Sequence, residues 1–141
     1  TNDSSTYDNS FCSQFEYENN LLEIITKIKS HNNRTGLNNC IPIPVLVTPP
    51  PVIDEKVAPF TSCNRIKQYA YIVKKLASEH NCPVVDFYNY MIEESNGNIN
   101  EYLQDDGVHL SYKGYDCMYD CIFSELTKLI NYEGILKDYN N

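Results

Sequence analysis

The stretch Asp106-Gly107-Val108-His109 carries a carboxylate and an imidazole at a spacing that lets the two side chains work together. A histidine that acts as a general base must be held in one tautomer with one ring nitrogen free. A carboxylate bonded to the other nitrogen does this and stabilises the imidazolium that forms. Asp106 and His109 can meet if the loop folds back, and Gly107 permits the backbone conformation that this requires. The stretch is therefore a candidate acid–base pair.

Local chemistry also leaves a simpler alternative open. Asp-Gly pairs are common in surface turns, and His109 would then be a half-buried loop residue. Taken in isolation, the stretch is better explained as such a turn. His31 and His80 each follow a predicted helix, where a histidine interacts with the helix dipole or faces solvent. Asn2 could donate to a developing oxyanion, although an asparagine near a chain start also fits a turn.

The elements that would position these residues alternate between helix and strand. Residues 1 to about 18 are polar and acidic and are predicted to form a loop. Apolar residues at helical spacing predict helices at about 18–30, 62–80 and 87–94, and after Ser111, a good N-cap. Short apolar runs predict buried strands at 43–48 and 83–87, with loops at 49–61 and 101–110.

The last helix is predicted to bury one apolar stripe, with Gly134 just past its end and a frayed tail at about 133–141. The members of this stripe are Tyr115, Met118, Tyr119, Ile122, Leu126 and Ile130.

This order of elements indicates an α/β protein with a parallel sheet covered on both faces. Two strands make a poor sheet, so we expect an incomplete architecture whose first strands lie upstream of Thr1. Such a chain would expose strand edges and apolar helix faces. It is therefore predicted to be poorly soluble or to associate with a complementary piece.

Composition narrows the classes of partner. The 141 residues are 42% hydrophobic and 21% charged, which suits one small globular domain. A net charge of -8 repels phosphate backbones, so no nucleic-acid partner is expected, and no apolar run is long enough to cross a bilayer. No Cys-X-X-Cys pair occurs, so no metal site is predicted. We interpret the cysteines as mostly reduced core residues, which favours a cytoplasmic over a secreted protein. They are Cys12, Cys40, Cys63, Cys82, Cys117 and Cys121.

Beyond local chemistry, an ordered set of motifs resembles the SGNH, or GDSL-type, hydrolases, and within them the isoamyl acetate-hydrolysing esterases. Thr1-Asn2-Asp3 resembles the end of the Gly-X-Asn-Asp block. Residues 45–51, with three prolines, and residues 84–87 resemble two strands of that subgroup. Residues 106–114 resemble the last block, Asp-Gly-X-His-Leu-Ser-X-X-Gly. These motifs span nearly the whole chain in the expected order.

The resemblance implies a flavodoxin-like, three-layer α/β/α fold, of which residues 1–141 would be the C-terminal part of a single SGNH domain. It implies that Asp106 orients His109, that His109 is the base, and that Asn2 donates to the oxyanion. The full protein would hydrolyse small carboxylic esters without a metal or organic cofactor. The Gly-Asp-Ser block that carries the nucleophile is not in the chain, so a complementary N-terminal segment would have to supply the serine and this chain alone would be inactive.

Two other interpretations remain open. The chain could be a catalytically inactive SGNH-like module used for binding or assembly, and the sequence upstream of Thr1 would discriminate between these functions. It could also be an unrelated α/β signalling domain, in which the side chains of Asp106 and His109 would lie far apart.

Overall fold

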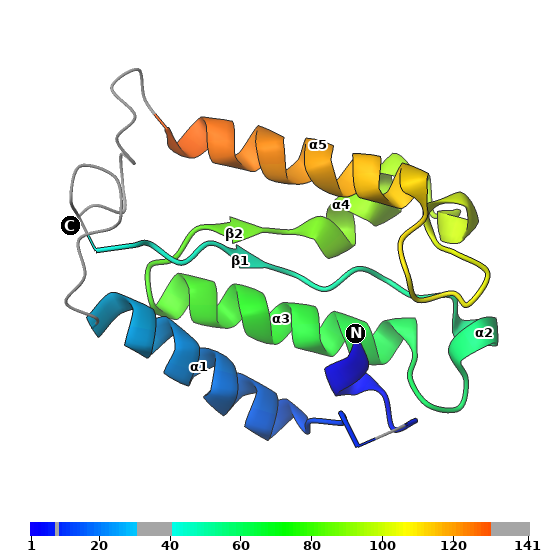
Figure 1. Cartoon of the computed structure of the whole chain (residues 1–141), viewed down its shortest axis with the longest axis horizontal. Helices are drawn as coiled ribbons and strands as arrows, with labels where there is room; N and C mark the ends of the chain where they lie inside the picture. Colours follow the sequence, from blue (N-terminus) through cyan, green and yellow to red (C-terminus); the bar gives the residue numbers. More distant parts are fainter. Residues whose placement is uncertain (8, 31–40, 131–141) are drawn as a thin grey trace.

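The computed structural model describes residues 1–7, 9–30 and 41–130. Its elements follow one another as a helix–strand alternation that ends on a long helix (Figure 1). In chain order they are η1 (Asn2–Ser4), α1 (Gln14–Ser30), β1 (Leu46–Val47), α2 (Asp54–Val57), α3 (Cys63–Glu79), β2 (Val84–Val85), α4 (Phe87–Glu94), η3 (Ile99–Tyr102) and α5 (Tyr112–Leu129). Gly134, His31, Cys40 and the tail at 133–141 lie outside the described residues.

β1 and β2 pair in parallel, with Leu46 opposite Val84 and Val47 opposite Val85. The backbone N–H of Leu46 donates to Pro83 at 2.9 Å, and that of Thr48 donates to Val85 at 3.0 Å. The parallel sheet is thus confirmed, but the strands are shorter than the predicted 43–48 and 83–87. Only the residues paired in this ladder form strands, and within the described chain β1 has a strand neighbour on one edge only.

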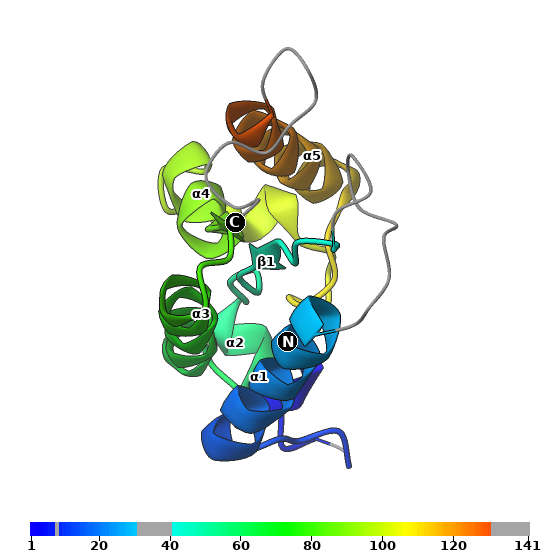
Figure 2. The same cartoon turned by 90° about the vertical axis from the view of Figure 1, so that its left-hand side faces the viewer.

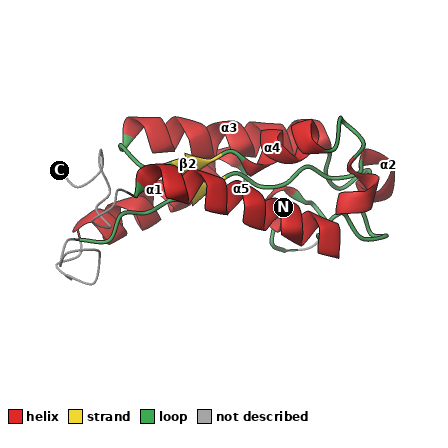
Figure 3. Cartoon of the chain, turned by 90° about the horizontal axis from the view of Figure 1, so that it is seen from above, coloured by secondary structure: helices red, strands yellow, loops and turns green. Residues whose placement is uncertain are grey.

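Helices cover both faces of the strand pair (Figure 2). On one face, Leu46 and Val84 pack with α1 and α3 around Ile25 and Leu76. On the other face, Val45 and Val85 pack with α4 and α5, as a cluster that includes Phe87, Met91, Cys117 and Cys121. Seen from above, the strands are short segments between long helices (Figure 3). The predicted three-layer α/β/α arrangement is confirmed.

The helix predicted from about residue 18 begins earlier, at Gln14. Ser13 and Glu16 form a capping box: the hydroxyl of Ser13 accepts from the N–H of Glu16 at 3.3 Å, and the Glu16 carboxylate accepts from the N–H of Ser13 at 2.9 Å. The prediction of a loop over residues 1–18 is therefore wrong at both ends, since residues 2–4 also form a 3₁₀ turn. The Ser-X-X-Glu spacing was the signal that would have placed the helix start.

Two short elements interrupt stretches predicted as loops. α2 lies within 49–61, and η3 overlaps the start of 101–110. Neither is long enough to show an apolar period in sequence. Both matter for the site, because each contacts the segment that carries Asp106 and His109.

α5 begins as predicted after the N-cap Ser111, but its predicted buried stripe is only partly correct, since Met118 and Ile122 pack against the core while other members are exposed. The buried face contains Gly114, Cys117 and Cys121. Tyr115 and Tyr119 are 54% and 63% exposed, and Ile130 is 45% exposed. The apolar period correctly predicted a helix. The apolar residues of α5, however, extend around more of its circumference than the described chain covers.

The described cysteines are free thiols. Cys82, Cys117 and Cys121 are buried, as core cysteines should be, whereas Cys12 and Cys63 are only partly buried. Burial raises the pKa of the Cys121 thiol to about 11, with smaller contributions from Cys117 and Glu125, so this thiol stays protonated at neutral pH.

Candidate active site

The side chains of Asp106 and His109 meet directly. Nδ1 of His109 lies 2.6 Å from Oδ2 of Asp106. The second carboxylate oxygen, Oδ1, accepts from the backbone N–H groups of Val108 at 2.8 Å and His109 at 3.0 Å. The same carboxylate therefore closes the loop and orients the imidazole. This contact contradicts the signalling-domain alternative, which required the two side chains to be apart.

Electrostatics favour an ionised Asp106. The hydrogen bond from His109, followed by the two backbone hydrogen bonds, lowers the pKa of Asp106 to about 2. The ring of His109 is 70% exposed, and Nε2 has no hydrogen-bond partner within the described part of the chain. A histidine in this arrangement has its Nδ1 occupied and its Nε2 free, as a general base requires.

Backbone hydrogen bonds hold the ends of this loop together. The N–H of Gln104 donates to His109 at 2.8 Å, and its side-chain amide donates to the carbonyl of Leu110 at 2.9 Å. Leu103 and Leu110 form an antiparallel bridge and are both buried. The dyad, formed by Asp106 and His109, therefore lies at the tip of a loop whose two ends are fixed in the core.

Gly107 allows the loop that carries Asp106 and His109 to pack closely against α2. Its φ is +73°, and a Cβ added to it would lie 2.8 Å from Cβ of Lys56 and 3.1 Å from that of Ile53. Its carbonyl accepts from the N–H of Ile53 at 3.0 Å. The position thus needs both a left-handed backbone and an absent side chain.

Gly107→Ala should lower the free energy of unfolding by about 2–4 kcal/mol, since the strained φ and the overpacking against α2 add together. Gly97→Ala is the matched control, because Gly97 has a similar φ of +81° but open space around its Cβ position. The control should lose only about 1 kcal/mol from backbone strain. Urea denaturation of both variants measures the difference, and equal losses would contradict the contact with α2.

The dyad opens onto a pocket of about 370 Å³. Its lining comes from the chain start, from α2 and the turn that follows it, and from the dyad loop: Thr1, Asn2, Ser5, Tyr7, Ser10, Lys56, Val57, Phe60, Thr61, Asp106, Val108 and His109. The structure thus brings Asn2 to the same pocket as Asp106 and His109, across more than one hundred residues of sequence.

Buried polar contacts place the chain start beside this pocket. Ser4 is 1% exposed, and its hydroxyl pairs with that of Thr61 at 2.9 Å. The guanidinium of Arg65 donates to the carbonyls of Ser4 at 3.2 Å and Phe60 at 2.8 Å. Asn2 belongs to the same turn, and its side-chain amide has no hydrogen-bond partner within the described residues. That amide is available to a ligand.

Sequence reasoning missed the aromatic wall of the pocket. Tyr7 and Phe60 pack edge to face, with ring centroids 4.9 Å apart, and join segments that are 53 positions apart in the chain. No local pattern links them, so only the folded chain reveals the pair. Among the described residues, no group of three or more His, Cys, Asp or Glu side chains is placed to hold a metal ion. No helix in the described part of the chain has the length and apolarity to cross a membrane.

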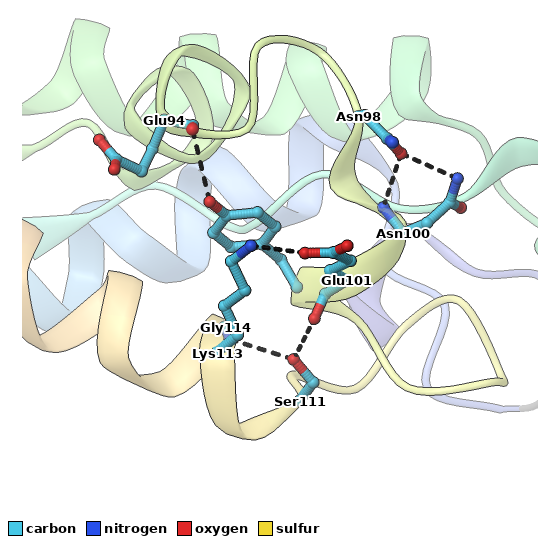
Figure 4. Close-up of polar contacts among 8 residues, drawn as sticks. Glu94, Asn98, Asn100, Glu101, Ser111, Lys113 and Gly114 are labelled. Atoms are coloured by element: carbon cyan, nitrogen blue, oxygen red, sulfur yellow. Dashed lines mark hydrogen bonds and ion pairs between the residues drawn. The ribbon is translucent and has the colours of Figure 1, made fainter.

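Ser111, the serine nearest to His109 in sequence, is engaged in capping α5 (Figure 4). Its hydroxyl accepts from the N–H of Gly114 at 3.2 Å and donates to the carbonyl of Glu101 at 2.6 Å. The ammonium group of Lys113 also forms an ion pair with the Glu101 carboxylate, at 2.6 Å. The Ser111 hydroxyl therefore uses both its proton and a lone pair in hydrogen bonds within the protein.

Ser111→Ala should cost about 1 kcal/mol of stability, the usual effect of losing an N-cap. It should leave hydrolysis by the complete enzyme unchanged within about twofold, since turnover does not depend on a capping hydroxyl. Ser124→Ala, within the same helix, provides the baseline for a serine that caps nothing. Thermal denaturation and an esterase assay measure the two effects, and a loss of activity larger than the loss of stability would give Ser111 a catalytic role.

The fold and the Asp106–His109 pair together define a class of protein: a parallel α/β domain with an Asp–His pair in the loop that precedes the last of its described helices. Within that class, residues 1–117 match the GDSL-like Lipase/Acylhydrolase family, and the chain belongs to this family. No curated protein matches the sequence.

Solved structures share the fold. A lipase/acylhydrolase from Enterococcus faecalis aligns with a TM-score of 0.70 and 28% identity, over 97% of this chain and 59% of its own. An acetylxylan esterase from Geobacillus stearothermophilus aligns with a TM-score of 0.63 and 25% identity, over 85% of this chain and 52% of its own. An alpha/beta hydrolase from the metagenome of Lake Arreo, Spain, shares the fold at 18% identity and a TM-score of 0.65. The chain thus spans between half and three fifths of these relatives.

Proposed function

We propose that this chain supplies the acid–base half of a carboxylic ester hydrolase, with Asp106 and His109 as two members of a Ser-His-Asp triad. The 2.6 Å contact between Nδ1 of His109 and the Asp106 carboxylate carries the proposal. Asn2 is proposed to donate to the oxyanion, since its unpartnered amide lines the same pocket. The nucleophilic serine is proposed to come from a complementary N-terminal segment outside these 141 residues.

In the proposed reaction the serine oxygen attacks the ester carbonyl carbon and passes its proton to Nε2 of His109. The bond to the alcohol then breaks, and His109 returns that proton to the departing oxygen. Water attacks the acyl-serine, again giving a proton to His109, and the acid leaves as the serine regains its proton. Asp106 stabilises the imidazolium in both halves of the cycle. No step requires a metal or organic cofactor.

The substrate is proposed to be a small ester with a short acyl chain. The pocket has the size of a small-ligand site and an apolar wall formed by Val57, Phe60 and Val108. The acetylxylan esterase among the similar structures acts, by its name, on acetyl esters. A catalytic variant of that esterase, in which the fifteenth residue is a serine changed to alanine, supports a serine mechanism for the family. The motifs that resemble isoamyl acetate-hydrolysing esterases favour the same size of acyl group.

The test is hydrolysis of p-nitrophenyl acetate by the chain alone and by the chain joined to the segment encoded directly upstream of Thr1. The proposal expects turnover from the joined protein only. Ser5 and Ser10 also line the pocket, so turnover by residues 1–141 alone would place the nucleophile inside the chain. No turnover by either form would favour the inactive binding module.

The pH profile should report the ionisation of Asp106. Its depressed carboxyl pKa means that the ionised contact is complete above the ordinary carboxyl range and is lost as pH falls towards about 2. Asp106 therefore stays ionised from about pH 4 upward. The ratio of kcat/KM between the complete enzyme and its Asp106→Asn variant should be constant above about pH 4 and should fall only below it. A ratio that already falls between about pH 6 and 4 would contradict the depressed pKa of Asp106.

A further inference from the structure

We infer that Lys56 binds a carboxylate of the substrate, so that the preferred small ester carries a negative charge in addition to its ester group. This inference rests on the proposed function and names the substrate class of the same pocket. Lys56 belongs to α2 and lines the pocket together with Asp106 and His109. It is the one lysine or arginine among the described residues that form this lining.

The aliphatic stem of Lys56 keeps its charge close to the acid–base pair. Cβ and Cδ of Lys56 lie 2.8 Å and 3.1 Å from the position that a Cβ on Gly107 would occupy. Gly107 directly follows Asp106, and its loop lies beside α2 (Figure 1). Lysine commonly packs its stem on a surface and keeps its ammonium group in solvent. Since that group follows Cδ by a single methylene, it stays near the loop.

Backbone contacts fix α2 to this loop and to α3. The N–H of Ile53 donates to the carbonyl of Gly107 at 3.0 Å. The carboxylate of Asp54 accepts from the N–H of Cys63 at 2.5 Å, so this neighbouring acid is engaged by the backbone. The fold therefore sets how far the charge of Lys56 lies from the acid–base pair. One small substrate can then present its ester to the pair and a second polar group to Lys56.

The ammonium group of Lys56 makes no hydrogen bond or ion pair within the described part of the chain. This is unusual here, because six of the eight described lysines donate to a carboxylate or to a backbone carbonyl. The six are Lys27, Lys29, Lys74, Lys75, Lys113 and Lys128. Of the other two, Lys67 lies outside the pocket, and only Lys56 lines it.

The pocket offers Lys56 no carboxylate of its own. Asp106 is the one acidic side chain in the described lining, and both its oxygens are occupied, one by Nδ1 of His109 and one by two backbone N–H groups. An unpaired cation beside a reacting group attracts anions, even in a chain with a net charge of -8. A lone ammonium group with no arginine near it in the lining suits a monoanion such as a carboxylate better than a phosphate.

The experiment compares two pairs of esters of matched shape on the complete enzyme, which is residues 1–141 joined to the segment encoded upstream of Thr1. Acetoxyacetate has a carboxylate where isobutyl acetate has an isopropyl group, on the alcohol part. Monoethyl succinate and ethyl isocaproate differ in the same way on the acyl part. The ratio of kcat/KM, anionic over neutral, should exceed one for at least one pair. It should shrink between about 0.01 M and about 1 M salt, since screening weakens an exposed charge pair.

Lys56→Gln should lower this ratio by about tenfold at low salt, the effect of one hydrogen bond to a charged group. Lys56→Arg keeps the charge and should keep most of the preference. Lys67→Gln is the matched control, because Lys67 is also an exposed lysine without a partner among the described residues. The pair that responds identifies whether the alcohol or the acyl part of the ester contacts Lys56.

Ratios that Lys56→Gln leaves unchanged in both pairs would overturn the carboxylate site and keep the proposed function. An equal fall in Lys67→Gln would also overturn it, because net charge would then be responsible. Hydrolysis of none of the four esters would overturn the proposed function instead. Calorimetric titration with succinate and isocaproate then decides the carboxylate site without catalysis. Lys56→Gln should lower the binding preference for succinate by about tenfold, and an unchanged preference would overturn the site.

Discussion

Replacing His109 by alanine in the complete enzyme should lower kcat for p-nitrophenyl acetate by roughly 10⁴- to 10⁶-fold. The imidazole is proposed to carry the proton in both half-reactions, and it is the only imidazole among the described residues that line the pocket. The side chain is 70% exposed, so its removal leaves no cavity and the fold should be unaffected.

His80→Ala is the control for this variant. His80 ends α3 and does not line the pocket. It should therefore retain the parental kcat, and both variants should keep the parental midpoint of denaturation. Full activity in His109→Ala would show that the assignment of the base is wrong, whereas loss of activity together with loss of folding would reveal a structural role.

Changing Asp106 to asparagine should have the second largest effect, a fall in kcat of about 10³- to 10⁴-fold with little change in KM. Asparagine keeps an oxygen that can accept from the N–H groups of Val108 and His109, so the turn should survive. It replaces the other oxygen by an amide donor, which can face only an unprotonated Nδ1. The proton then sits on Nε2, where a general base must be free.

Asp105→Asn provides a matched control, because Asp105 is the exposed neighbour and makes no hydrogen bond or ion pair among the described residues. It removes the same charge from the same loop and should change kcat by less than about twofold. Steady-state kinetics of the two variants separate orientation of the imidazole from the general effect of one negative charge. Similar losses in both would show that charge alone is responsible.

The contact between Asp106 and His109 could be predicted from sequence because it is local. The two residues lie within one turn, so spacing alone shows that they can meet. The resemblance implied that they do, and the 2.6 Å contact confirms it. Asn2 is different. Only the resemblance linked it to the pair, since its position depends on Ser4, Thr61 and Arg65, which are brought together by the folded chain.

Helix periodicity predicted α3 and α5 well but could not say which apolar residues are buried. The stripe on α5 was expected inside because tyrosines at helical spacing indicate a packed face. Whether that face is packed depends on a neighbour, and periodicity contains no information about neighbours. Elements of one turn, such as α2 and η3, were missed because they are shorter than the period used to find them.

The base of the dyad loop has a consequence for how activity should be lost under mild denaturation. The contacts that orient His109 join residues 104 to 110, and closing so short a loop costs little entropy. Asn2 reaches the same pocket only through long-range contacts, since Ser4 in its turn pairs with Thr61 and Arg65, which are 57 and 61 positions away. Closing such long loops costs more entropy, so these contacts should open first in low urea. The proposed enzyme would then pass through a state in which Asp106 still orients His109 but the proposed oxyanion donor Asn2 is displaced, so that inactivation precedes unfolding.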